Sequence, residues 1–236
     1  MQIQSFDFPN GKIIRNYHIV DFLGKGWEGE VYLIKEISTG IDRIVKFFYP
    51  KRNVRGRASK YYAKKMHKLR NCGIIIQYHT QGTISFKGQP ITYLISEFIE
   101  GEKLSDFVNK QPGKRLQPFM ALHFLHSLAK GMDCIHMMGE YHGDLHQGNI
   151  ILQRHGLGFD LKLIDLHHLG ATKPEHIRDD VIDMIKVFYE VLGGVQHYSK
   201  LPVEIKDICC GLKSSLIFKK FRTAGQLKQY IENMEW

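Results

Sequence analysis

Three closely spaced glycines lie between two segments that are predicted to be β-strands, and this arrangement strongly constrains the fold. Segment 17–23 leads into Gly24, Gly26 and Gly29, and segment 30–35 follows them. Both flanking segments are rich in β-branched and aromatic residues, as strands are. In dinucleotide-binding folds and in P-loops, the glycine-rich loop opens a helix. Because a strand follows here, the sequence predicts a β-hairpin with a glycine-rich tip.

Such a glycine-rich tip has two interpretations. Glycine supplies the backbone conformations of a tight turn, which would be a purely structural role. A loop without side chains also lets the backbone approach phosphate groups closely and donate N–H groups to them. The pattern Gly24-x-Gly26-x-x-Gly29-x-Val31 alone does not decide between the two interpretations.

The first half of the chain is predicted to be mostly strands and the second half mostly helices. In the first half we expect further strands at 41–48, 74–84 and 90–98, and a helix at 58–69. In the second half, apolar residues at helical spacing predict helices at 116–138, 179–192, 201–212 and 223–234. The change in character near 97–101 predicts two domains, 1–98 and 99–236.

The positive charge is concentrated in one segment. The chain has 33 Lys and Arg, 24 Asp and Glu, and a formal net charge of +9, yet residues 47–96 contain ten Lys or Arg and no acid. A solvated helix face, an anionic lipid surface, and an acidic or phosphorylated partner are all compatible with such a segment. Few aromatic residues interleave with the basic ones, so a nucleic-acid partner has little support. We keep 51–70 as a candidate contact for an anionic partner or membrane surface.

Cysteine and histidine do not predict a metal site. The four cysteines form no Cys-x-x-Cys pair, and we expect them to be free thiols in a reducing compartment rather than a disulfide framework: Cys72, Cys134, Cys209 and Cys210. Five histidines are spread over helix, loop and strand end, which favours structural or catalytic-loop roles: His136, His142, His146, His167 and His168.

The sequence contains no apolar run of the roughly 20 residues needed to span a bilayer. Its first residues do not have the basic and apolar regions of a secretory signal. The expected location is therefore the cytoplasm, with peripheral contact at the inner face of a membrane as an option.

Two acids and one amide lie at predicted loops beside short apolar strands. Asp144 and Asn149 belong to the run His-Gly-Asp-Leu-His-Gln-Gly-Asn, and Asp165 belongs to segment 161–167, which we predict to be a second strand. Carboxylate and amide oxygens are ligands that Mg²⁺ prefers, and a carboxylate can accept the proton of an attacking hydroxyl. These residues would otherwise be ordinary solvated loop residues. Together with the glycine loop and Lys46, the combination favours a Mg·ATP site.

These motifs resemble those of the protein-kinase superfamily, over about residues 17–234. The resemblance implies an α+β, two-lobed protein-kinase-like fold, with an antiparallel β N-lobe and a helical C-lobe. It also implies ATP and Mg²⁺, and an acceptor that carries a hydroxyl group, either a protein or a sugar.

The resemblance assigns roles to individual residues. Asp144 would be the catalytic base, and Asn149 and Asp165 would hold the metal. Lys46 would bind the α and β phosphates, and His146 stands where serine/threonine kinases have a Lys beside the transferred phosphate. The nucleotide-binding residues that it implies are Gly24, Gly26, Gly29, Val31, Ile44, Lys46, Glu97 and Ile99.

The largest departure from the family concerns the partner of Lys46. In the family, the helix after the third strand carries a glutamate that pairs with this lysine, but residues 47–96 contain no acid. Lys46 would then bond Asp165 or Glu28, unless Glu28 is merely solvated. Gly143 replaces an arginine that reads a phosphorylated loop in many kinases, so switching by loop phosphorylation is not expected.

In the family, the activation segment builds the groove for a peptide substrate, and the corresponding segment is short in this sequence. Only 15 positions separate Asp165 from Asp180, the residue that would hold the catalytic loop from below. The leading hypothesis is an atypical, bacterial-type serine/threonine protein kinase. A small-molecule or lipopolysaccharide-core sugar kinase is the alternative, because the run Asp165-Leu166-His167 resembles those enzymes. A nucleotide-binding pseudokinase is a further alternative, motivated by the missing helix glutamate.

Overall fold

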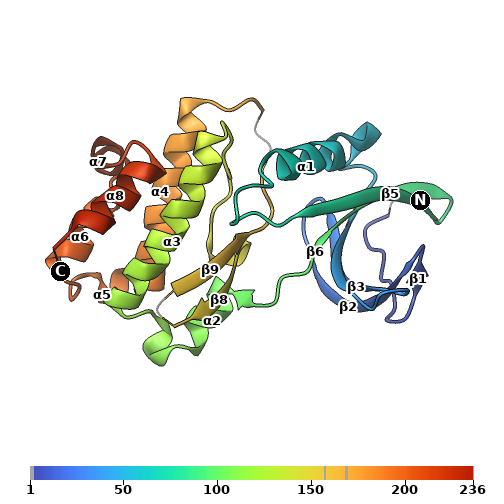
Figure 1. The fold of residues 1–236 in the computed structure, drawn as a ribbon, viewed down its shortest axis with the longest axis horizontal. Coiled ribbons are helices and arrows are strands. Elements are labelled where there is room, and N and C mark those ends of the chain that lie inside the picture. Colours follow the sequence, from blue (N-terminus) through green and yellow to red (C-terminus); the bar gives the residue numbers. More distant parts are fainter. Residues whose placement is uncertain (1–2, 157, 168–169, 236) are drawn as a thin grey trace. The chain divides into compact units, whose positions relative to one another are not determined.

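The computed structural model describes residues 3–156, 158–167 and 170–235 (Figure 1). His168 lies outside the described residues. The chain divides into two compact units, residues 1–71 with 76–99 and residues 72–75 with 100–236. We call these the first and the second unit. The predicted division at residue 98 does not anticipate that the short segment 72–75 belongs to the second unit.

The first unit contains a six-stranded antiparallel sheet. Its strands are β1 (Ile13–Ile14), β2 (Tyr17–Lys25), β3 (Gly29–Glu36), β4 (Asp42–Phe48), β5 (Tyr78–Phe86) and β6 (Gln89–Glu97). They are ordered β1-β2-β3-β4-β6-β5. The strand expected at 74–84 begins only at Tyr78. The reason is that Ile74 and Ile75 are bound elsewhere: the N–H of Leu163 donates to the carbonyl of Ile74 at 2.8 Å, and Ile75 forms a bridge with Leu163.

One helix belongs to the first unit, among the described residues. The 3-10 turn η1 (Val54–Gly56) precedes helix α1 (Arg57–Lys68), close to the expected 58–69. Helix α1 packs against β5 and β6, and Figure 1 shows it beside β5. Most basic side chains of 51–70 are exposed, whereas Lys65 is 2% exposed. The proposed contact of this segment with an anionic partner stays a prediction.

The N-terminal residues cover one part of the sheet and were not anticipated from the sequence. The Phe6 and Phe8 rings pack against Phe47 of β4, with centroids 5.8 and 5.0 Å apart. Glu30 of β3 is 1% exposed. Its carboxylate accepts hydrogen bonds from the N–H of Phe6 at 3.1 Å, and from the hydroxyls of Ser5, Tyr32 and Tyr49. The sheet is thus tied to the N-terminal segment by a buried, fully bonded carboxylate.

The second unit is mainly helical. Its helices are α2 (Leu104–Lys110), α3 (Pro118–Met137), α4 (Pro174–Val191), α5 (Val195–Tyr198), α6 (Val203–Cys209), α7 (Ser214–Lys220) and α8 (Ala224–Asn233). Its 3-10 turns are η2 (Pro112–Lys114), η3 (Gln147–Asn149) and η4 (Cys210–Leu212). Helices α3 and α4 run side by side, and α8 packs on α3 (Figure 1). The four expected helices are present with shifted ends, and the short α2, α5 and α7 were not predicted.

A three-stranded sheet completes the second unit. It is ordered β7-β8-β9, with β7 (Glu102–Lys103), β8 (Ile150–His155) and β9 (Gly158–Leu163). Strands β8 and β9 form an antiparallel pair in which Ile150 faces Leu163. The strand expected at 161–167 therefore ends earlier, before Asp165. No helix among the described residues is long and apolar enough to cross a membrane.

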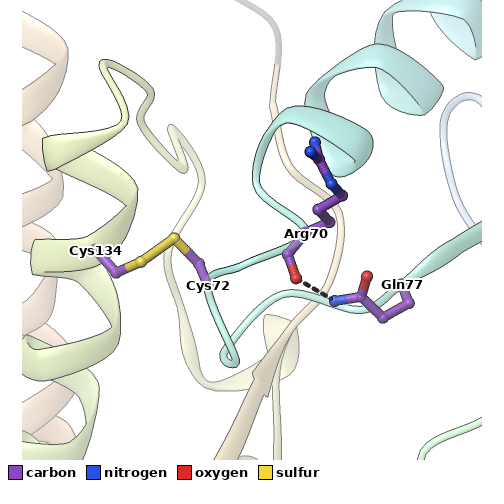
Figure 2. The surroundings of a disulfide bond; sticks show 4 residues. All are labelled: Arg70, Cys72, Gln77 and Cys134. Atoms are coloured by element: carbon purple, nitrogen blue, oxygen red, sulfur yellow. Dashed lines mark hydrogen bonds between the residues drawn. A yellow bond between two sulfur atoms is a disulfide. The ribbon is translucent and has the colours of Figure 1, made fainter.

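A disulfide joins two cysteines that were expected to be free thiols. Cys72 forms a disulfide with Cys134, which lies on α3 and follows Cys72 by 62 positions. Figure 2 shows the Cys72 side chain directed at α3. The prediction of four free thiols was wrong for this pair, because a wide separation in sequence does not show which side chains the fold brings together. Cys209 and Cys210 are free, as expected. In the first unit, the Gln77 side-chain amide donates to the carbonyl of Arg70 at 3.0 Å, which joins the two ends of segment 71–76 (Figure 2).

Candidate functional site

The glycine-rich loop is the turn between β2 and β3. The N–H of Gly26 donates to the carbonyl of Gly29 at 2.9 Å, and Gly24 pairs with Val31 across the hairpin. A Cβ on Gly29 would lie 1.8 Å from the carbonyl oxygen of Phe47, so only glycine fits there. A Cβ on Gly26 would meet no atom within 4 Å. Close strand packing thus explains Gly29, whereas packing places no such demand on Gly26.

Lys46 pairs with a carboxylate from this loop. Its Nζ lies 3.0 Å from Oε2 of Glu28, and the two side chains are 18% and 27% exposed. The backbone helps to place Glu28, because its carbonyl accepts a hydrogen bond from the N–H of Tyr49 at 2.8 Å. From the sequence, Glu28 could either pair with Lys46 or be merely solvated. The structure confirms the pairing.

Two aromatic rings also lie against Lys46. Nζ is 4.5 Å from the centre of the Tyr62 ring and 5.5 Å from that of Phe48. Tyr62 belongs to α1, the helix on which the family resemblance placed a glutamate. Tyr62 was not predicted from the sequence, although an aromatic residue in the middle of an acid-free helix was the available signal. An ammonium over an aromatic face is attracted by the ring quadrupole.

The residues expected around the adenine lie at adjacent ends of β4 and β6. Ile44 and Ser96 are cross-strand partners, and Ser96 is buried. Glu97 ends β6, and Ile99 follows it in an irregular segment. The N–H of Glu97 donates to the carbonyl of Gln77 at 3.0 Å, and the N–H of Gln77 donates to Oε1 of Glu97 at 2.9 Å. This N–H group of Glu97 is thus already bonded within the first unit.

In the second unit, the loop before β8 brings Asp144 and Asn149 together. The amide nitrogen of Asn149 donates to the backbone carbonyl of Asp144 at 2.9 Å and to its Oδ2 at 3.3 Å. Asn149 is 6% exposed, whereas the Asp144 side chain is 52% exposed. Because the nitrogen of Asn149 is used inside the loop, its amide oxygen is the atom that suits a cation.

Asp165 lies next to this loop, as the sequence analysis predicted. The N–H of Ile164 donates to the carbonyl of Asn149 at 3.0 Å, and the N–H of His167 donates to that of His142 at 2.8 Å. These two bonds hold the segment around Asp165 against residues 142–149. Asp165 itself has a φ of 56°, a left-handed conformation that aspartate tolerates better than most residues.

His146 lies beside Asp144, at the edge of the same loop. Its Nε2 is 3.8 Å from Oδ2 of Asp144, and its Nδ1 accepts a hydrogen bond from the N–H of Gly148 at 3.1 Å. The acceptor role of Nδ1 places any ring proton on Nε2, facing Asp144. Its contribution to catalysis stays a proposal.

The buried Asp180 of α4 holds the loop around Asp144 through hydrogen bonds. It is 1% exposed and accepts hydrogen bonds from the N–H groups of His142 at 2.8 Å and Gly143 at 2.9 Å. Nε2 of His136 lies 3.1 Å from its Oδ2. The structure therefore shows the contact that the family resemblance implied for Asp180.

The short segment between Asp165 and Asp180 is partly helical. Pro174 and Glu175 form the first turn of α4, which begins five residues before the predicted start at residue 179. The described residues of the segment are bound to the helical unit: the Tyr141 hydroxyl donates to the carbonyl of Gly170 at 3.1 Å, and the Thr172 hydroxyl donates to that of Gly139 at 2.8 Å. These bonds attach the segment without a phosphate group.

A pocket of about 330 Å³ adjoins the loop around Asp144 in the second unit. Gly143, His176, Asp179, Asp183 and Lys186 contribute to its lining. Burial raises the pKa of the Asp183 carboxyl, and Lys186, which donates to its Oδ1 at 2.9 Å, opposes that rise. Charged side chains of both signs thus line the pocket.

The oxygen donors of the second unit fit Mg²⁺ better than a soft metal. Asn149 and Asp165 supply an amide and a carboxylate oxygen on neighbouring segments tied by a backbone bond. Among the described residues, no three His, Cys, Asp or Glu side chains converge as a metal-binding group. A Mg²⁺ ion here would thus be completed by waters and phosphate oxygens, as is usual for this ion.

Comparison with known families agrees with this arrangement. Residues 17–200 match the family model of the protein kinase domain. The chain belongs to the protein kinase family. Its glycine hairpin, Lys46 and the loop around Asp144 all lie within the matched residues.

Relatives with known names are serine/threonine kinases. The chain is 26% identical over 185 residues to the serine/threonine-protein kinase pkn2 of Myxococcus xanthus, which covers 78% of this chain and 21% of the relative. It is 25% identical over 211 residues to the serine/threonine-protein kinase PLK4 of Danio rerio, covering 78% of this chain and 22% of the relative. The chain thus spans about a fifth of the length of these kinases.

Solved structures show the kinase fold. Two crystal structures of variants of the Mycobacterium tuberculosis PknI kinase domain have TM-scores of 0.67 and 0.71. They cover 97% and 96% of this chain and 98% of theirs, at 16% and 15% identity. The expected two-lobed kinase-like fold is therefore confirmed.

Proposed function

We propose that this chain binds Mg·ATP and transfers the γ-phosphate to a serine or threonine hydroxyl of a protein. The observation that carries the proposal is the hydrogen-bonded arrangement of Asp144, Asn149 and the Asp165 segment. It presents a carboxylate for the acceptor hydroxyl beside oxygen donors for a cation. The membership in the protein kinase family supports the same chemistry.

Each residue has a defined task in this proposal. Asp144 accepts the proton of the attacking hydroxyl, and its half-exposed carboxylate is reachable by an acceptor. Asn149 and Asp165 hold Mg²⁺, which when bound neutralises phosphate charge. Lys46 orients the phosphates from the first unit, and His146 donates a hydrogen bond near the transferred group. Asp180 keeps the loop in place from below.

The nucleotide would contact backbone and apolar groups of the first unit. Gly24, Gly26, Gly29 and Val31 line the hairpin over the phosphates, and the β4 residue Ile44 packs on the adenine. Glu97 and Ile99 offer backbone groups to the adenine edge. Because the N–H of Glu97 already donates to Gln77, we assign the carbonyl of Glu97 to this contact.

A sugar or small-molecule kinase is the second candidate, and one observation favours it. The segment 165–180 is short, and its residues from Pro174 onward belong to α4. Such a segment leaves little chain to build a peptide groove. A small acceptor needs no such groove and would bind in the pocket of about 330 Å³ beside Gly143.

A transfer assay separates these candidates. ATP labelled in the γ-phosphate is incubated with Mg²⁺ and the protein, in turn with protein acceptors, with sugar and lipopolysaccharide-core acceptors, and without acceptor. Label on serine or threonine supports the proposal, and label on sugar alone would replace it with the second candidate. A thermal shift with Mg·ATP but no transfer to any acceptor would indicate a pseudokinase.

A further inference from the structure

Helix α1 contacts Lys46 through a tyrosine. Nζ of Lys46 lies 4.5 Å from the centre of the Tyr62 ring and 3.0 Å from Oε2 of Glu28. We propose that Tyr62 is a positioning residue, which together with Glu28 replaces the glutamate that α1 lacks. Tyr62 would couple the position of the helix to the phosphate-binding lysine. This inference rests on the proposed function, since its consequence is read in Mg·ATP binding.

The geometry places Tyr62, rather than its neighbour, at the lysine. Ser59 and Met66 are buried in α1, three residues before and four residues after Tyr62, so Tyr62 shares their inward face. Its ring packs against Phe48 with centroids 6.0 Å apart. Phe48 follows Lys46 by two positions on β4 and hence lies on the same face of the sheet. Lys46 therefore lies beside two rings, one from the sheet and one from the helix.

The adjacent Tyr61 does not share this environment. Nζ of Lys65, on the same helix, lies 5.6 Å from the centre of the Tyr61 ring. Tyr61 and Tyr62 are therefore two tyrosines on one helix, both partly buried, with different cations as ring partners. Tyr61 therefore provides a control of the same residue type, on the same helix and also partly buried.

An aromatic ring and a carboxylate interact differently with the lysine ammonium group. An ammonium group has three N–H donors, and Glu28 accepts one hydrogen bond from it. The ring face attracts the cation through its quadrupole and adds no negative charge near the phosphates. Tyr62 and Glu28 thus both hold Lys46, and the ring does so without accepting an N–H hydrogen bond at an added anion.

A first experiment measures the contact without nucleotide. The labelling rate of Lys46 by an amine-reactive ester is followed by mass spectrometry in wild type, Tyr62→Leu, Tyr62→Phe and Tyr61→Leu. We expect Tyr62→Leu to label Lys46 about five times faster, because the ring shields and stabilises the ammonium form. Tyr62→Phe keeps the ring and should behave as wild type, as should Tyr61→Leu. Equal labelling of Lys46 in all four proteins would overturn the contact.

A second experiment measures the consequence. Mg·ATP affinity and the separate values of kcat and KM are determined for the same variants, and again with Lys46→Met. We expect Tyr62→Leu to weaken Mg·ATP binding about five- to tenfold, with Tyr62→Phe within about twofold of wild type. With Lys46→Met, Tyr62→Leu should have no added effect. An undiminished effect there would show that Tyr62 acts by packing alone and would overturn the inference.

Two further outcomes are distinguishable. If the four proteins show the expected labelling of Lys46 but the wild type does not bind Mg·ATP, the proposed function is overturned and the ring–lysine contact stays established. If Tyr62→Leu melts below the temperature of the other variants, Tyr62→Met takes its place. It fills similar space without a ring face, so the same expectations apply.

Discussion

The Lys46 ammonium donates a hydrogen bond to the Glu28 carboxylate at 3.0 Å. Lys46 belongs to β4, and Glu28 lies in the turn between β2 and β3 of the same sheet. An acid at the tip of the hairpin that we propose to bind phosphate would repel phosphate if it were alone. Paired with Lys46, it fixes the lysine instead. The first unit thereby contains, between the turn after β2 and strand β4, the ion pair for which the family uses a helix glutamate.

Removing this carboxylate should impair turnover. For Glu28→Ala we expect kcat/KM for ATP to fall about fivefold, which corresponds to a partly buried ion pair of about 1 kcal/mol. Steady-state kinetics measure the change. Glu36→Ala, at the far end of β3, removes the same group away from Lys46 and should leave kcat/KM unchanged. Unchanged turnover in Glu28→Ala would mean that the pair has no catalytic role.

The disulfide should make a large contribution to stability. Cys72 and Cys134 close a loop of 62 positions, and such a loop restricts the unfolded chain by about 4 kcal/mol in the chain-entropy description. We expect Cys72→Ser to lower the free energy of unfolding by roughly that amount, as measured by urea denaturation. Cys210→Ser replaces a free cysteine and serves as the control. Similar unfolding midpoints for the two variants would contradict this account.

Asp180 should be essential to the order of the loop around Asp144. Asp180→Ala leaves two backbone N–H groups without their acceptor, at a cost of about 3 kcal/mol in unfolding free energy. Hydrogen exchange at Gly143 should accelerate in this variant. Its neighbour Asp179, with a side chain 58% exposed, provides the control variant Asp179→Ala. Equal stability and exchange in both variants would show that Asp180 does not hold the loop.

Two phenols of the first unit, the buried Tyr32 and the partly buried Tyr49, should make the stability of the protein fall at high pH. Burial, and next the hydrogen bond to Glu30, raise the pKa of Tyr32 and Tyr49 above the ordinary 10.0. A raised folded-state pKa means that the stabilisation is complete below pH 10.0 and is lost as pH rises through the folded-state pKa.

This prediction is tested by urea unfolding at about pH 9 and about pH 11, where we expect a loss of about 1–2 kcal/mol. Tyr49→Phe should reduce this pH dependence, because it removes one of the two groups. Stability that does not change across this range would contradict the assignment.

The elements that follow local patterns were predictable from the sequence. The glycine hairpin, the strands around it and the long α3 depend on residue spacing within about 20 positions, which the sequence displays directly. The arrangement of Asp144, Asn149 and Asp165 was also predictable. Each of them adjoins a short apolar strand, and antiparallel pairing of β8 with β9 brings their ends together.

The features that escaped prediction depend on long-range contacts. Cys72 and Cys134 meet only because segment 72–75 packs on α3 in the second unit. The aromatic contact of Tyr62 with Lys46 requires the orientation of α1 on the sheet, which helical periodicity does not specify. The start of α4 was misplaced because residues 174–178 are mostly polar and give no apolar stripe, although Pro174 suits a first helical turn.

The central claim is that Asp144 acts as the base in a phosphoryl transfer from Mg·ATP. The most direct measurement is transfer of labelled γ-phosphate by wild type, Asp144→Asn and Asp160→Asn, the last being a change of an exposed acid on β9. We predict transfer by wild type and Asp160→Asn, and a loss of at least about 100-fold in Asp144→Asn with Mg·ATP affinity retained. Equal transfer by Asp144→Asn and wild type would contradict the claim.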